Sequence, residues 1–233
     1  MSTKVTVRAL AYGGKFIGGA VGFGHVEIFN PGQANPLAHG WTDAGLIKGT
    51  DGSGVTADIM QQPYIWGQPI NDDQATAFHA DIDLTEPTVL SFVVTSKANP
   101  DIKAYCYRQF IPGVPLTGDM AVVVVLAGLL VDLTSPTTID LASGIPPSIA
   151  ASVRMMCGCK IDNDFWPVKN FVIQATVTGG AQTQVVPLTY TGNPSFFAAP
   201  FPFLERGEYS VTITAKEYNG NIGITKPQTV TVR

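Results

Sequence analysis

The chain has 233 residues, of which 45% are hydrophobic and only 14% are charged, and its formal net charge is −4. The hydrophobic fraction is high enough for a packed core, which excludes a disordered chain, and the length suffices for two modest domains. Low charge together with 24 glycines and 17 prolines is typical of an all-β protein rich in turns. No cluster of basic residues is present, so the composition argues against a nucleic-acid partner.

The first half of the chain consists of short segments in which apolar and polar residues alternate. Each alternating segment is predicted to be a strand, and together they cover 4–12, 25–29, 77–84, 88–96 and 104–110. The third and fourth segments are expected to form a hairpin around Glu86 and Pro87. Turns that recur at intervals of roughly 8 to 12 residues indicate a β-sandwich or barrel.

The longest apolar run is "MAVVVVLAGLLV" at 120–131, bounded by Asp119 and Asp132. It is well short of the ~20 apolar residues that a membrane-spanning helix needs. The chain is therefore predicted not to span a membrane. The valines of the run favour a strand buried on both faces, or two strands that meet near Gly128.

The second half of the chain is also predicted to consist of strands, because no segment of it has a convincing helical period. The predicted strands are 149–156, 171–178, 183–190, 196–203, 207–217 and 224–232. The glycine pair at 179–180 marks a turn, and the stretch 218–223 is predicted to form the tip of a hairpin.

The stretch "FLERGEYSVTITAKEYNGNIG" at 203–223 resembles the last hairpin of bacterial immunoglobulin-like (Ig-like) domains. The family's Gly-x-Tyr-x-Val, Ala-x-(Asp/Glu) and Gly-Asn-x-Gly steps are matched by Gly207, Tyr209, Val211, Ala215, Glu217, Gly220, Asn221 and Gly223. The resemblance implies a tyrosine corner, in which the hydroxyl group of Tyr209 bonds to the backbone upstream, and positive φ at Gly220 and Gly223. The cysteine pair and core tryptophan of antibody domains are missing, so a generic Ig-like sandwich is implied.

The stretch 24–59 is similar to carboxypeptidase-regulatory or transthyretin-like β-sandwich modules, with matches at Val26, Ile28, Leu37, Ala38, Gly40, Thr42 and Asp43. The whole chain also looks like a group of uncharacterised bacterial proteins that carry a Met-Cys-Gly-Cys step. The expected fold is therefore all-β, with two tandem β-sandwich domains at 1–130 and 131–233, the second of them Ig-like. Such modules are commonest in exported proteins, whereas the N-terminus shows no signal peptide. We expect a periplasmic or secreted protein whose leader has been removed, with a cytoplasmic location as the alternative.

The most unusual stretch is "MMCGCKIDNDFW" at 155–166, in which Cys157 and Cys159 flank one glycine. Three interpretations of this loop stay open. The thiolates could bind Cu(I) or Zn(II). They could form a strained, redox-active disulfide. They could also be structural cysteines in a tight turn. The further candidate ligands of a metal site are Met156, Asp162 and Asp164, and only one of the two methionines is expected to point outward from a strand.

An Ig-like sandwich would bring this loop to the same end as the tip of the last hairpin. Oxygen atoms from both segments would then meet, which makes calcium a further candidate ligand. The residues concerned are Asp162, Asp164, Glu217, Asn219 and Asn221. The competing interpretation is that these aspartates and asparagines simply form turns.

Four aromatic residues in loops rich in glycine, proline and aspartate could bind sugar rings or partner surfaces, namely Trp41, Tyr64, Trp66 and Trp166. They could equally fill the seam between the domains.

No Gly-x-Ser-x-Gly or His-Glu-x-x-His motif is present, and the three histidines are widely spaced. The expected function is that of a non-enzymatic binding or structural module of a bacterial envelope or secreted system, with a protein or carbohydrate partner. The alternatives are a copper- or zinc-binding protein that uses the Cys157-Gly158-Cys159 loop, and a hydrolase with a site between the domains.

Overall fold

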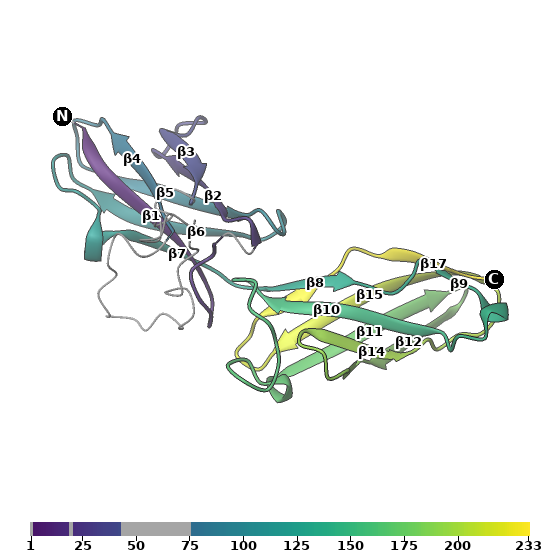
Figure 1. Cartoon of the computed structure of the whole chain (residues 1–233). Helices are drawn as coiled ribbons and strands as arrows, with labels where there is room; N and C mark the ends of the chain where they lie inside the picture. The colour runs from purple at the N-terminus through teal and green to yellow at the C-terminus, as the bar shows by residue number, and fades with distance from the viewer. Residues whose placement is uncertain (1, 19–20, 43–75) are drawn as a thin grey trace, which may run out of the picture. The chain divides into compact units, whose positions relative to one another are not determined.

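A computed structural model describes residues 2–18, 21–42 and 76–233, so Asp43, Tyr64 and Trp66 lie outside the described residues. The chain divides into two compact units (Figure 1). The first unit contains Met1–Ala127 and Met156–Gly158, and the second contains Gly128–Met155 and Cys159–Arg233. Both units are built from strands, as the alternating pattern predicted.

The first unit is a β-sandwich of two sheets. One sheet has the order β4-β1-β7, in which β1 runs antiparallel to β4 and parallel to β7. The other has the order β3-β2-β5-β6 and is antiparallel throughout. The strands are β1 (Thr3–Ala11), β2 (Gly24–Phe29), β3 (Ala38–Trp41), β4 (Phe78–Ile82), β5 (Thr88–Ser96), β6 (Lys103–Phe110) and β7 (Val122–Leu126). A short 3-10 helix, η3 (Gly118–Met120), precedes β7.

The predicted hairpin around Glu86 and Pro87 is wrong. β4 pairs with β1, whereas β5 pairs with β2 and β6. The turn between β4 and β5 therefore carries the chain from one sheet of the sandwich to the other. Alternation within a strand indicates which of its faces is buried, but it does not specify the strand with which it pairs.

The second unit is an Ig-like β-sandwich, as predicted. One sheet has the order β13-β14-β10-β8, and the other has the order β12-β11-β15-β17-β9, with β16 also paired to β15. The strands are β8 (Leu129–Leu133), β9 (Thr138–Ile139), β10 (Ser148–Met155), β11 (Phe171–Gly179), β12 (Gln182–Pro187), β13 (Thr189–Tyr190), β14 (Phe196–Pro200), β15 (Gly207–Glu217), β16 (Ile222–Ile224) and β17 (Gln228–Val232). Two short 3-10 helices, η4 (Leu141–Ser143) and η5 (Val168–Asn170), lie in its connections.

The long apolar run forms two strands, as one of the two predictions had it. β7 ends at Leu126, β8 begins at Leu129, and Gly128 between them has a φ of 145°. This backbone conformation is open to glycine and costly for other residues. In the part of the chain that the structure describes, no helix has the length and apolar character needed to cross a membrane.

The tyrosine corner implied by the Ig-like resemblance is present. The hydroxyl group of Tyr209 donates to the carbonyl oxygen of Glu205 at 2.9 Å, and its ring stacks on Phe203 with 5.0 Å between centroids. Gly220 has the expected positive φ of 102°.

The expectation of a positive φ at Gly223 is wrong. A Cβ atom there would lie 2.5 Å from the carbonyl oxygen of Leu129, so this glycine is required by the close packing of β16 against β8.

Candidate functional site

The thiol-bearing stretch forms a tight three-residue bend at the end of β10. The backbone N–H of Met155 donates to the carbonyl oxygen of Cys159 at 3.0 Å, and Gly158 has a φ of 82°. A reversal this short needs one residue in the left-handed region, which glycine adopts without a steric penalty. Local backbone geometry therefore accounts for the glycine between the two cysteines.

The side chains of this bend are buried. Cys157 is 5% exposed, and Met155 and Met156 are 0% and 1% exposed, so the expectation that one methionine points outward is wrong. Met156 lies in the bend, where the alternation of a strand no longer applies. A Cβ atom at Gly14 would lie 3.3 Å from the Sγ atom of Cys157, which shows how closely the backbone at Gly14 approaches this thiol. None of the three cysteines, all of which are described, forms a disulfide.

The loop after the bend and the tip of the last hairpin share one end of the second unit, as predicted. The N–H of Tyr218 donates to the carbonyl oxygen of Asn170, and the N–H of Gly128 donates to Oδ1 of Asn221, both at 2.9 Å. Asn221 is fully buried, and its Nδ2 atom donates to Oε2 of Glu217, which is also buried. These two polar side chains therefore tie the hairpin to the start of β8.

The other proposed oxygen ligands lie in turns. Oδ1 of Asp162 accepts the N–H of Asp164 at 2.8 Å, as in a turn closed by an aspartate side chain. Asp164 and Asn219 are exposed. Across the described ranges, no group of three or more His, Cys, Asp or Glu side chains is arranged to hold a metal ion. The copper, zinc and calcium interpretations stay predictions.

Two of the four predicted surface aromatics are described, and only Trp41 is exposed as expected. Trp41 is on strand β3 rather than in a loop, and it is 39% exposed. Trp166 is only 8% exposed, whereas its neighbour Phe165 is 61% exposed. Trp166 therefore belongs to the core and not to a binding surface.

Apart from Tyr12, the exposed aromatic side chains described in the first unit lie on the outer face of the sheet β3-β2-β5-β6. Leu90, Phe92 and Val94 of β5 are fully buried, so the residues between them face outward. Their cross-strand partners on β6 are Tyr105 and Tyr107, which are 63% and 66% exposed. We define the aromatic face as the outward positions that carry rings on this sheet, which are His25, Phe29, His39, Trp41, Tyr105 and Tyr107.

The rings at the β3 edge of the aromatic face contact one another. The ring centroids of His25 and Trp41, a cross-strand pair, are 5.0 Å apart, and those of His25 and His39 are 6.0 Å apart. The Nζ atom of Lys97 lies 5.3 Å from the centroid of Trp41. Edge-to-face and cation–π contacts of this kind hold the rings in defined orientations.

The sequence contained a signal for this face, although the predicted surface aromatics were all placed in loops. In "KAYCYRQF" the two tyrosines share one strand face with Lys103 and Gln109, and the other face carries Cys106 and Phe110. Either face could have been the buried one. The register with β5 decides the matter, because it pairs Cys106 with the buried Phe92.

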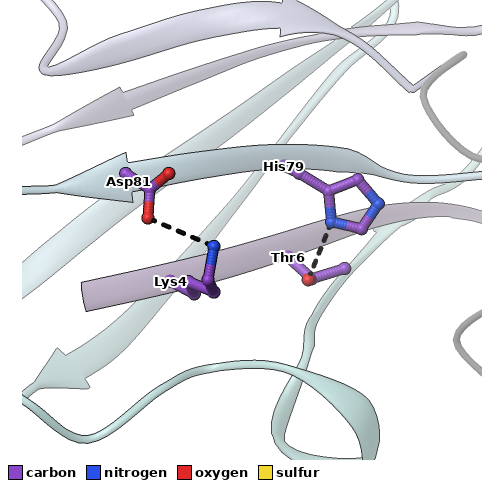
Figure 2. A network of polar contacts seen from close by, with 4 residues as sticks. All are labelled: Lys4, Thr6, His79 and Asp81. Carbon is purple, nitrogen blue, oxygen red and sulfur yellow. Dashed lines mark hydrogen bonds and ion pairs between the residues drawn. The ribbon is translucent and has the colours of Figure 1, made fainter. Parts of the chain in front are cut away.

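A second polar cluster lies on the other sheet of the first unit. Figure 2 shows Lys4 and Thr6 of β1 beside Asp81 and His79 of β4, their cross-strand partners. Oγ1 of Thr6 and Nδ1 of His79 are 3.1 Å apart, and Nζ of Lys4 lies 3.7 Å from Oδ1 of Asp81. A shallow cavity of about 220 Å³ opens beside them, next to Thr117.

This cluster fits a structural role better than a catalytic one. A Thr–His pair at hydrogen-bond distance is the beginning of a nucleophile–base arrangement. However, Thr6 is only 2% exposed, so a substrate has little access to its hydroxyl group. The ion pair between Lys4 and Asp81 is highly exposed and contributes little. The cavity is also smaller than the roughly 300 to 1,000 Å³ of typical ligand pockets.

No protein-family model matches the chain, and no curated protein matches it significantly. Solved structures with a similar arrangement of strands include fibronectin(III)-like modules of Clostridium thermocellum CbhA, with 11% identity, coverage of 100% of this chain and 93% of that one, and a TM-score of 0.28. BcpA, the major pilin subunit of Bacillus cereus, has 11% identity, coverage of 100% and 69%, and a TM-score of 0.35. A DUF3823 family protein from Bacteroides ovatus has 9% identity, coverage of 100% of both chains and a TM-score of 0.31. Likenesses at this level transfer no function.

Proposed function

We propose that this protein is a non-enzymatic binding module of a bacterial envelope or secreted system, and that the aromatic face is its recognition surface. The observation that carries the proposal is the exposure of Tyr105 and Tyr107, at 63% and 66%, on the outer side of a regular sheet. Rings left in water forgo the favourable burial of a large apolar area. A cluster of such rings on one face is therefore best explained by a partner that covers them.

The position of the rings on strands supports the same function. Tyr105 and Tyr107 lie on the edge strand β6, whose backbone is held by its pairing with β5, so their side chains lose less freedom on binding than side chains in loops. Val93, at the centre of the outer face, is only 8% exposed, because the larger side chains of Glu27 and Tyr105 occupy the positions in register on either side. The face therefore presents a preformed surface.

The proposal is tested by retention on the surface of cells that produce the protein. Fluorescently labelled protein is incubated with intact cells and with their isolated envelope fraction, and bound protein is measured against concentration. We expect saturable retention that falls roughly tenfold or more in the double variant Tyr105→Ala/Tyr107→Ala, because truncation of central aromatic anchors commonly costs more than 1 kcal/mol each. The matched control is Tyr218→Ala, which removes an 87% exposed tyrosine from the second unit. Equal retention of the double variant and the wild type would reject the aromatic face as the recognition surface.

A further inference from the structure

The aromatic face combines flat rings with hydrogen-bonding groups. His25, Glu27 and His39 stand at neighbouring outward positions of β2 and β3. On β6, Gln109 follows the two tyrosines on the same side of the strand. A ligand that fits this pattern has apolar C–H faces to lie on the rings and hydroxyl groups between them to meet the polar side chains. Sugar rings have this composition.

The face carries charges of both signs and only a small net charge, because Glu27 is negative and Lys103 and Lys97 are positive. Glu27 and Lys103 are the charged side chains at the outward positions of the four strands. The ammonium group of Lys97, from the turn after β5, lies over the ring of Trp41. A strongly charged polymer would need a surface of one opposite sign, so the face is suited to a neutral partner.

The size of the face argues against a protein as the partner. Four strands span about 15 Å across and the eight residues of β6 about 25 Å along, which gives roughly 400 Å². Stable protein interfaces need about 800 Å² on each side. A polysaccharide chain is only one or a few sugar rings wide, so an area of this size is enough to bind it.

From these observations we infer that the ligand of the aromatic face is an extended, neutral polysaccharide chain. The rings of Tyr105, Tyr107 and Trp41 would lie against its sugar rings, and His25, His39 and Glu27 would bond to its hydroxyl groups. This inference rests on the proposed function, since it names the partner of the same surface. An extended chain is specified because the rings stand at outward positions that follow one another along the strands of one sheet.

Affinity electrophoresis in native gels tests the inference directly. The gels contain hydroxyethyl cellulose, xyloglucan or glucomannan as neutral extended polymers, and dextran or alginate as flexible and anionic comparisons. We expect at least one of the three extended polymers to retard the wild type, with an association constant that falls roughly tenfold or more in Tyr105→Ala/Tyr107→Ala. Tyr218→Ala should migrate like the wild type. The exposure of both tyrosines keeps the double variant folded, which circular dichroism checks.

The outcomes separate this inference from the proposed function. Three results would overturn the inference of a neutral polysaccharide ligand. They are the failure of all three extended polymers to retard the protein, equal retardation of the double variant and the wild type, and retardation by alginate alone. Envelope fractions treated with periodate, which cleaves sugar diols, or with protease give the second readout. In one outcome, retention depends on the two tyrosines, persists after periodate and disappears after protease. The proposed function then stands, and the partner is a protein and not a polysaccharide. Retention that does not depend on the tyrosines would contradict both the proposed function of the aromatic face and the polysaccharide ligand.

Discussion

The two sandwiches expose outer sheet faces of very different composition. In the first unit, the outward positions of β3, β2, β5 and β6 carry the aromatic face. In the second unit, the equivalent outward positions of β11, β15 and β17 carry mainly small hydroxyl-bearing and polar side chains, with Val172 and Lys216 at one end of the face. The hydroxyl-bearing and polar residues include Gln174, Thr176, Thr178, Ser210, Thr212, Thr214, Thr229 and Thr231. Threonine has a high strand propensity and keeps its hydroxyl group in water. The outer face of such a sheet can therefore form without rings at its strand positions, so the rings on the outer sheet face of the first unit require another reason.

The second unit places its unusual residues inside. Tyr209 closes the corner before β15, and Asn221 and Glu217 join the hairpin tip to the start of β8. The unusual residues of the second unit stabilise its fold, whereas the rings of the aromatic face in the first unit are available to contact a partner. Substitutions should therefore affect stability in the second unit and binding in the first.

Asn221→Ala should have the largest effect on stability. It leaves the N–H of Gly128 and the carboxylate of Glu217 without the bonds that Asn221 makes to them. Buried groups left unsatisfied cost about 1–3 kcal/mol each, so we expect a loss of roughly 3 kcal/mol in the free energy of unfolding. Chemical denaturation followed by circular dichroism measures it, with the exposed Asn219→Ala as the control. A change within about 0.5 kcal/mol would show that the hairpin tip tolerates the loss of this link.

Tyr209→Phe should have an intermediate effect. It removes the hydroxyl group that donates to the carbonyl oxygen of Glu205 and keeps the ring stacked on Phe203. The expected loss is about 1 kcal/mol in the same denaturation experiment. Tyr190→Phe is the matched control, because the hydroxyl group of Tyr190 bonds to a backbone carbonyl at an exposed site. Equal losses in both variants would argue against a special role for the tyrosine corner.

The double variant Tyr105→Ala/Tyr107→Ala should change stability little although it removes two aromatic rings. Exposed positions away from caps and turns usually tolerate substitution within about 0.5 kcal/mol each. A loss of several kcal/mol in the unfolding of the first unit would mean that the tyrosines are part of its core packing. The contrast between the two faces would then disappear.

A smaller effect is expected on the alkylation rate of Cys106, which lies on β6 with the two tyrosines. Burial raises the pKa of the Cys106 thiol above its usual value, and the nearby positive charge of Arg108 partly offsets this by lowering the pKa. Less thiolate is present at pH 8 than for an unperturbed thiol, so iodoacetamide should react slowly. Arg108→Ala removes the offsetting charge and should slow the reaction further, by roughly twofold for a solvent-screened charge. Mass spectrometry of the proteolytic peptide that contains Cys106 measures the alkylation rate. Faster alkylation in Arg108→Ala than in the wild type would show that the charge of Arg108 does not act on the thiol as expected.

Millimolar calcium should leave the melting temperature of the protein unchanged. Glu217 and Asn221 are buried and bonded to each other, and Oδ1 of Asp162 accepts a backbone N–H, so these oxygens are already engaged. Calcium needs six to eight oxygen ligands. Differential scanning calorimetry with and without calcium measures the shift. A rise of several degrees that Asp164→Ala abolishes would support the calcium interpretation instead.

Much of the fold could be predicted from particular residues. The alternating segments became strands, and the valine run divided near Gly128 into β7 and β8. The hydroxyl group of Tyr209 bonds to the upstream backbone as the Ig-like resemblance implied. The candidate site was predicted less well. The predicted surface aromatics were all in loops and included the buried Trp166, whereas Tyr105 and Tyr107, which are exposed on a strand, were not among them.

The sequence by itself determined the strands, their turns and the two-sandwich organisation, because alternation and turn chemistry act between residues a few positions apart. Only the tertiary structure decided which strands pair, which side of β6 faces water, and whether Asn221 is a ligand or a buried link. These properties depend on register and on contacts between distant segments, and one strand pattern is compatible with more than one partner. The aromatic face exists because β3, β2 and β6 bring to one side of a sheet rings that lie up to 82 residues apart in the chain, from His25 to Tyr107.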